Sequence, residues 1–524
     1  MRPAERHYPL ESEEEADRVL HTLHDRFPSR LEPQEESSRI YYDTFDWRLY
    51  KDRSVLTLTL AGRAGTIRWN SLDGTPRCRL RRLSMPAFAA DFPQGPCRGA
   101  LAPILAARRL FPIVRLSCRT ATLQLLDDRR KTIAAVVREG CTACRPDDED
   151  GTQLSPGLRL VPVRGYAVAA GEVRAVLEGE LRLRPEEDGE LARILAAIGR
   201  EPGDYSSKLD LRLAPEMTAA AAARLVHRHL LATLHANEAG VRDNLDEEFL
   251  HDFRVASRRA RSALGQIKAV FPQDIVDHYR EELAWLGSVT GPTRDLDVYL
   301  GNMGDYRASL PEAAHDALAP LLAFLEGHHR TEHDRLVEAL GSPRYRKLVE
   351  GWQHFLDQTT IEGPAPANAS RPVSEVASKR IWRIYRRVLK DGRSIAPESP
   401  ATALHRLRID CKKLRYLMEF FRSLYDTETV ERLIDSLKQL QDNLGYFNDC
   451  VVQQETLRRL AQQMADEDGM PVETYLAMGR LQALLEERQG AERARFAERF
   501  AQFSADEHRQ LFQRLFAPQD RAKS

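Results

Sequence analysis

Two near-copies of one basic helical stretch decide the fold of this chain: HDFRVASRRARSAL from His251 and HRLRIDCKKLRYLM from His405. Aligned on their histidines, both copies repeat cationic side chains at steps of three, four and three residues, which keeps one helix face in register. The first stripe is His251, Arg254, Arg258 and Arg261, and the second is His405, Arg408, Lys412 and Arg415. The opposite face of each copy is apolar, so we expect it to pack while the basic stripe meets a ligand.

The match extends beyond these stripes. Arg259 and Lys413 also correspond, although they lie beside the stripes, and GPTRD (291–295) matches GYFND (445–449) at the same distance from its histidine. A chance basic helix would not bring a matched Gly-x-x-x-Asp motif with it, so we infer an internal duplication of a unit the size of a domain. Asp295 and Asp449 cannot bind an anion directly. Either they orient a neighbouring Arg or His, or they are simple turn residues.

Composition limits the classes of function. The 524 residues predict two to four domains, and 42% hydrophobic with 30% charged residues suits soluble globular domains. The net charge of −1 excludes a chain that binds nucleic acid through overall positive charge. Seven scattered cysteines and no apolar segment after Met1 indicate a reducing, cytoplasmic compartment. No stretch approaches the ~20 apolar residues that a membrane span needs, so we expect no membrane contact.

Residues 1–213 have mostly β patterns. LTLTL at 56–60 alternates with period two, a hairpin is expected around 127–130, and further strands are expected near Val161 and at EVRAVLEGELRLR (172–184). Two helices fit between them, SEEEADRVLHTLHDRF and ELARILAAIGR, and the first has the Ser12 to Glu15 spacing of a capping box. The sequence therefore predicts a mostly β unit with flanking helices.

Residues 217–520 change to helical periodicity. We expect four helices in each copy, forming two antiparallel bundles, with repeat one at about 217–360 and repeat two at about 373–520. The helix at 379–390 holds six cations and no acid, and beside the His405 helix it would widen the basic surface. Its cations are Lys379, Arg380, Arg383, Arg386, Arg387 and Lys390.

The duplicated helices, each followed by Gly-x-x-x-Asp, resemble the CHAD family, the conserved histidine α-helical domain. The resemblance implies paired four-helix bundles that bind inorganic polyphosphate. Carried over by position, the anion-binding residues are the two stripes, with Arg259 and Lys413 beside them. To these we add Lys379, Arg383, Arg386, Arg387 and Lys390, with Asp295 and Asp449 as orienting residues.

The first part resembles a CYTH domain, the triphosphate-tunnel fold, through IYYDTFDWRLYKDRSVLTLTL, LEGELRLR and YSSKLDLRL. The resemblance implies an antiparallel β tunnel or barrel with flanking helices. The family's opening Glu-x-Glu-x-Lys is reduced to PAERH, and its alternating arginines are replaced by threonines. The residues concerned are Pro3, Glu5, His7, Thr57 and Thr59, while Glu178, Glu180 and Lys208 are kept. Hydrolysis of a triphosphate needs a divalent cation on carboxylate oxygens. We therefore expect a silent tunnel with no catalytic residue, no metal and no cofactor; Mg²⁺ or Mn²⁺ enters only if the tunnel is active.

Polyphosphate offers a row of charges and no bases, so its binder needs aligned cations rather than aromatic stacking platforms. Binding should weaken with salt and, if His251 and His405 become protonated on the ligand, tighten from about pH 8 to 6. The rivals are a metal-dependent triphosphatase in the first half, RNA binding by the basic helices, and a merely solvated helix face. We expect a cytoplasmic protein at polyphosphate granules.

Two further patterns are expected to be structural. Cys141 and Cys144 form a CxxC pair without the second pair that zinc requires, so free thiols at a strand end are expected. His329 and His333, with His328 beside them, fit an exposed helix face.

Overall fold

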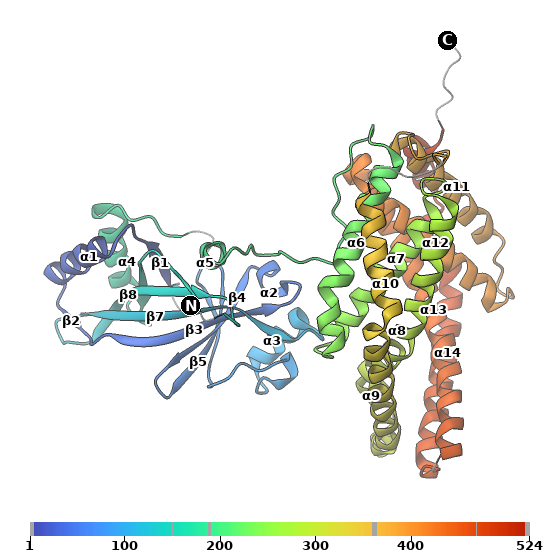
Figure 1. Cartoon of the computed structure of the whole chain (residues 1–524). Coiled ribbons are helices and arrows are strands. Elements are labelled where there is room, and N and C mark those ends of the chain that lie inside the picture. Colours follow the sequence, from blue (N-terminus) through green and yellow to red (C-terminus); the bar gives the residue numbers. More distant parts are fainter. Residues whose placement is uncertain (1–4, 149, 187–189, 359–363, 468, 519–524) are drawn as a thin grey trace. The chain divides into compact units, whose positions relative to one another are not determined.

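The computed structural model (Figure 1) describes residues 5–148, 150–186, 190–358, 364–467 and 469–518. The chain divides into two compact units, Met1–Ser206 and Ser207–Ser524. The stretch YSSKLDLRL spans this division, so Lys208 belongs to the second unit, and Pro3 lies outside the described residues.

One antiparallel sheet, curled into a half-barrel, forms the first unit. Its path runs β1-β10-β8-β7-β3-β4-β5-β6, with β2 on β7 and β9 on β8. The hairpin expected around 127–130 joins β7 to β8, and the LTLTL stretch lies in β4. The strands are β1 (Arg6–Pro9), β2 (Ser29–Leu31), β3 (Glu35–Thr44), β4 (Ser54–Ala61), β5 (Ala64–Ser71), β6 (Pro76–Arg81), β7 (Leu110–Leu126), β8 (Thr132–Cys144), β9 (Thr152–Gln153) and β10 (Gly157–Pro162).

Helices cover the sheet as its alternating pattern requires. Helix α1 is capped by the Ser12 side chain, which accepts from the Glu15 N–H at 3.2 Å, so the predicted cap is confirmed. Val19 of α1 packs with Val136 of β8 on one face, and Ile194 of α5 packs with Val114 of β7 on the other. The helices are α1 (Glu13–Arg26), α2 (Arg48–Lys51), α3 (Pro96–Leu105), α4 (Ala167–Ala175) and α5 (Leu191–Ala197), with a short 3₁₀ turn at Ala89–Asp91.

The strand expected at 172–184 is wrong. This stretch forms the end of α4 and a π-helical turn, Val176–Glu180. Val173, Val176 and Leu177 follow helical spacing and are buried together against the sheet, which outweighs the alternation of the later leucines. Glu178 and Glu180 therefore lie on a helical turn rather than along a tunnel strand.

The expectation of free thiols at Cys141 is also wrong. Cys141 of β8 lies directly opposite Cys118 of β7, and the two form a disulfide with Cα atoms 4.2 Å apart. A second disulfide joins Cys78 to Cys97, whereas Cys144 is a buried free thiol. Spacing along the sequence could not reveal these pairs, because strand register and the packing of α3 bring them together.

The second unit is helical and duplicated, with five helices in each repeat of the described residues rather than the four expected. The short helices α10 and α15 are the additions, starting after Ser342 and Ala505. The first repeat holds α6 (Ala219–Arg242), α7 (Glu247–Gln266), α8 (Gln273–Ala308), α9 (Ala319–Gly341) and α10 (Pro343–Asp357). The second holds α11 (Val373–Arg393), α12 (Ala401–Phe420), α13 (Thr427–Glu467), α14 (Val472–Phe503) and α15 (Asp506–Phe516). Short 3₁₀ turns lie at Glu312–Ala314, Asp316–Leu318 and Arg422–Leu424.

The two repeats share a core instead of forming separate bundles. Tyr299 of α8 and Phe324 of α9 belong to the same buried cluster as Leu457 of α13 and Leu481 of α14. Figure 1 shows these four long helices running together. Both Gly-x-x-x-Asp motifs lie inside α8 and α13, so their interpretation as turns is wrong.

None of the described helices combines the length and the apolar character that spanning a bilayer requires.

Candidate functional site

Helices α7 and α12 carry the two predicted stripes and pack against each other across the repeats. Asp246 caps the start of helix α7, and its side chain accepts from the N–H groups of Glu248 and Phe249. The predicted apolar faces are buried, as Phe253 and Leu407, both fully inaccessible, illustrate. The polar faces therefore lie away from the core.

The basic stripes of the two repeats meet. Arg258 Nε of α7 donates to the Tyr416 hydroxyl of α12 at 3.1 Å. Burial, followed by the charges of Arg258 and Arg408, lowers the pKa of Lys412 to about 7. Burial also lowers the pKa of Arg408; Asp449 opposes this effect and Arg258 adds to it. We call Arg258, Arg408 and Lys412 the basic face.

The basic face is short of counter-charge. Across the described parts of the chain, neither Arg258 nor Lys412 forms an ion pair with a carboxylate. Arg408 Nη2 donates to Asp449 Oδ1 at 3.3 Å, and His405 Nδ1 lies 2.6 Å from Asn448 Oδ1. The GYFND motif of α13 thus contacts the stripe of α12 through two successive side chains.

In the first repeat the corresponding contacts tie α7 to α8. Arg254 Nη1 donates to the Gly287 carbonyl at 3.0 Å and to Thr290 Oγ1 at 2.7 Å. A Cβ at Gly291 would lie 3.6 Å from Arg254 Nη1, so the motif glycine leaves room for this guanidinium. Burial, then the charge of Arg294, lowers the pKa of His251. Sequence analysis did not select Arg294, although it stands inside the GPTRD motif.

Some predicted cations are neutralised by neighbours. Glu419 pairs with Arg259 at 2.8 Å and with Arg415 at 3.4 Å, and Lys413 pairs with Asp410 at 2.7 Å. Arg261 is exposed on α7. These side chains surround the basic face but carry less free charge than Arg258 and Lys412.

The cations of α11 point in two directions. Arg380 donates to Gln266 of α7 at 2.7 Å, and Arg387 lies 4.0 Å from Asp410 of α12, so this part of α11 adjoins the basic face. Arg386 instead lines a cavity toward α15. The side chains of Lys379, Arg383 and Lys390 are exposed.

The exposed histidine face expected on α9 is wrong. His329 is buried, and its Nε2 lies 2.7 Å from Asp297 Oδ1 on α8, two residues beyond the GPTRD motif. His333 Nε2 is 2.8 Å from the Val241 carbonyl. Packing of α9 on α8 buries this side of the helix, which the polar sequence GHHRTEHD does not predict.

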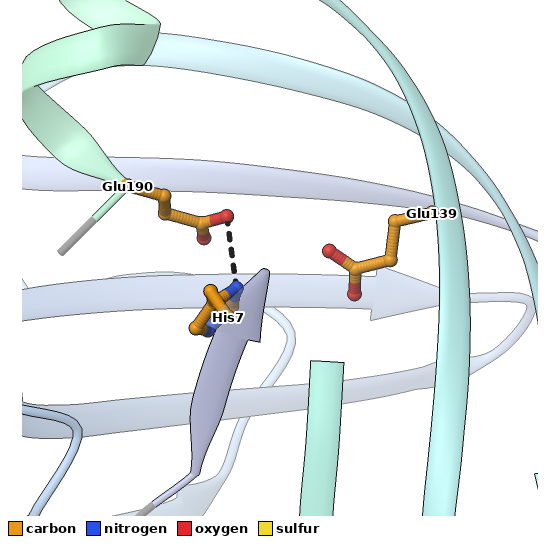
Figure 2. Close-up of side chains that lie close together, drawn as sticks. All are labelled: His7, Glu139 and Glu190. Atoms are coloured by element: carbon orange, nitrogen blue, oxygen red, sulfur yellow. Dashed lines mark ion pairs between the residues drawn. The ribbon is translucent and has the colours of Figure 1, made fainter. Parts of the chain in front are cut away.

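The half-barrel holds its own cavity of about 460 Å³, lined among others by Glu5, His7, Arg39, Arg68 and Glu190. Figure 2 shows His7 and Glu190, joined by an ion pair at 3.3 Å, with Glu139 close by. One potential ligand atom from each of these three residues lies within 4.8 Å of those of the other two. The cluster therefore has the composition of a metal site.

Its chemistry does not fit a metal ion. Glu139 is paired with Arg39 at 2.7 Å and with Arg159 at 2.8 Å, and Glu190 is paired with Arg39 at 2.7 Å. Burial alone would lower the pKa of His7, but the charge of Glu190 raises it, so this histidine favours the protonated form. A divalent cation requires a neutral imidazole and free carboxylate oxygens. Here the imidazole favours its protonated form, and arginines already occupy the carboxylate oxygens.

Other residues that the CYTH resemblance had selected also form ion pairs. Glu5 pairs with Arg159 at 3.1 Å and Arg68 at 3.6 Å, and Glu178 pairs with Arg6 at 3.0 Å. Arg26 Nη2 lies 2.9 Å from a Glu180 oxygen. Thr57 and Thr59 do line the cavity, but Arg68, opposite Thr57 in the neighbouring strand, places a cation there. Sequence analysis missed Arg39 and Arg68. The alternation of side chains along their strands was the signal that could have placed them in the cavity.

Residues 225–458 match the family model of the CHAD domain. This part of the chain is a CHAD domain. An uncharacterised protein of Mycobacterium tuberculosis, from strains CDC 1551 / Oshkosh and H37Rv, is 27% identical over 305 residues, which cover 53% of this chain and 55% of the relative. The chain therefore spans about half the length of the curated relatives it matches.

Three solved structures are similar to parts of this chain. The crystal structure of the CHAD domain from the plant Ricinus communis is 26% identical, with a TM-score of 0.44, and covers 59% of this chain and 97% of that one. PptA from Streptomyces chartreusis is 17% identical, with a TM-score of 0.41, and covers 55% and 99%. A putative adenylate cyclase from Bacillus halodurans is 15% identical, with a TM-score of 0.24, and covers 35% and 91%.

Proposed function

We propose that this chain binds inorganic polyphosphate on the basic face of its CHAD domain, without a metal or cofactor. The observation that carries the proposal is the hydrogen bond from Arg258 of α7 to Tyr416 of α12, which places this guanidinium where its charge lowers the pKa of Lys412. It thereby joins the stripes of both repeats. Cations held close together repel each other, and a polyanion that binds them relieves the repulsion.

Polyphosphate suits this face better than RNA does. Arg258 and Arg408 offer guanidinium groups whose planar geometry fits phosphate oxygens, and Lys412 adds a point charge. Tyr416, the aromatic residue at the centre, is 3% exposed and bonded to Arg258, so it offers no open ring on which a base could stack. A ligand made only of phosphates meets these donors without losing base contacts.

The test is binding of long-chain polyphosphate to the full chain by calorimetry over a range of salt concentrations. We expect wild type to bind in a salt-sensitive way and the variant with Arg254, Arg258, Arg408 and Lys412 changed to Ala to lose most of its affinity. The control is Arg346→Ala with Lys347→Ala, which removes two exposed charges from α10, a helix that contacts α6, α8 and α9.

Equal affinity of wild type and the quadruple variant would contradict the proposal. A loss of similar size in the α10 control would mean that overall charge, not the basic face, attracts the ligand. Competition with single-stranded RNA distinguishes the ligands, because we expect polyphosphate to displace RNA and not the reverse.

We further propose that the half-barrel does not hydrolyse triphosphate. We also propose that the chain works at polyphosphate granules; its two disulfides, Cys78–Cys97 and Cys118–Cys141, count against the reducing cytoplasm that the cysteine pattern led us to expect. The arginines that hold Glu139 and Glu190 support the first point. Release of phosphate from tripolyphosphate with Mg²⁺ or Mn²⁺ would favour the second candidate, a metal-dependent triphosphatase.

A further inference from the structure

The CHAD-bearing unit has a cavity of about 280 Å³ between α11 and α15. Trp382, Tyr385, Arg386 and Arg393 line it from α11, and Arg509 lines it from α15. The ring of Tyr385 stacks on Phe512 with 3.8 Å between centroids, which fixes the wall of the cavity. Its position on α11 separates it from Arg380 and Arg387, which face α7 and α12.

The hydroxyl of Tyr385 is a buried hydrogen-bond donor that a bound ligand would satisfy. The residue is 1% exposed, and its hydroxyl has no hydrogen-bond partner in the described structure. Burial raises the pKa of Tyr385 to about 12, while Arg509 and Arg393 act in the opposite direction, so the hydroxyl keeps its proton and remains a donor. A buried donor without an acceptor is costly, and such a group in a native protein needs an explanation.

The charges around the cavity favour an anion. Arg509 pairs with Asp506 at 2.8 Å. The side chains of Arg386 and Arg393 form no ion pair or hydrogen bond with other described residues. The cavity thus presents two unpaired guanidinium groups, a tyrosine hydroxyl and a single carboxylate that is already paired. Several oxygens on one compact centre, as in a phosphate group, can accept from all these donors together.

The first repeat supplies an internal comparison. At the offset that relates His251 to His405, Tyr385 corresponds to Leu231, Arg386 to Ala232 and Arg393 to Ala239. Helix α6 therefore has the same position in the fold without the tyrosine or the two arginines. Because packing alone is satisfied by Leu and Ala in one copy, the polar set of the other copy is not required by the fold.

We propose that the cavity between α11 and α15 binds a phosphate group through Tyr385, Arg386 and Arg393. The source is either a small phosphate compound or the end of a polyphosphate chain. The inference does not rest on the proposed function of the basic face.

The experiment uses the full chain with Arg258→Ala and Lys412→Ala, so that the basic face does not contribute. Pyrophosphate is added while tryptophan fluorescence is followed, since Trp382 lines the cavity. We expect a saturable change that disappears with Trp382→Phe. Affinity should fall about tenfold with Tyr385→Phe, which removes one hydrogen bond to a charged group, and further with Arg386→Gln plus Arg393→Gln. Circular dichroism confirms that each variant is folded.

The charge control is Arg346→Gln with Lys347→Gln, which should leave the affinity for pyrophosphate unchanged. A signal with long-chain polyphosphate alone, lost in the Arg386 and Arg393 variant, assigns the cavity to a chain end. No saturable signal with either probe at low salt would overturn the proposal. So would equal losses in the control and in the cavity variant.

Discussion

Lys412 is the residue whose chemistry links the geometry of the basic face to a measurable property. Its ammonium lies on α12 among Arg258, Arg408 and Arg415, and Asp449 provides the opposing charge. The resulting pKa of about 7 leaves this lysine only partly charged in the free protein at neutral pH. A bound polyanion favours the charged form, so binding draws a proton onto Lys412.

We therefore predict that polyphosphate affinity is pH-dependent above neutrality. The bound state holds the proton more tightly than the free state, so the contribution of Lys412 is fully present below pH 7. It weakens as pH rises above 7, by at most about tenfold per pH unit for one proton. Titrations between pH 6 and 9 at constant ionic strength measure this slope.

The matched control is Lys412→Arg, which keeps its charge over this range and should flatten the profile. An unchanged slope in that variant would assign the dependence to other groups. The histidines are the alternative expected from sequence. Since burial and Arg294 lower the pKa of His251, its own contribution is expected at more acidic pH than that of an ordinary histidine.

At the scale of the elements, glycines in the helices of repeat two predict opposite effects on stability. A Cβ at Gly392 of α11 would overlap the ring of Phe500 on α14, whereas a Cβ at Gly445 of α13 meets no atom within 4 Å. Gly392→Ala should lower the free energy of unfolding by about 1–3 kcal/mol. Gly445→Ala should raise it by about 0.5–1 kcal/mol, because glycine is unfavourable inside a helix.

Chemical denaturation of both variants measures the difference. Stability losses of similar size would show that the contact between α11 and α14 is not the cause. If Gly445→Ala stabilises the chain but weakens polyphosphate binding, the motif glycine keeps space for the ligand beside Asn448 and Asp449.

Local pattern predicted most elements and failed where tertiary contacts decide. The positions of α7, α11 and α12 followed from amphipathic spacing. The lengths of α8 and α13 did not, because Gly-x-x-x-Asp resembles a helix break although Pro292 and Gly445 lie inside continuous helices. The strand expected at 172–184 failed because burial of Val173 and Leu177 favours a helix there.

At the scale of the whole chain, the sequence predicted two units and the two basic stripes. It did not predict that the two stripes meet. Each stripe follows from spacing along one helix, whereas the contact between Arg258 and Tyr416 depends on how the repeats pack. The same limit applied to the half-barrel, where Arg39, Glu139 and Glu190 come from distant strands and a loop. A single sequence gives no measure of such distances.

The most direct test of the central claim is a double-mutant cycle for long-chain polyphosphate with Arg258→Ala, Lys412→Ala and both together. If the two repeats form one basic face, the two losses are coupled and the double variant departs from their sum by more than about 0.5 kcal/mol. If the losses add within that limit, Arg258 and Lys412 act on separate surfaces and the account of a shared face is wrong.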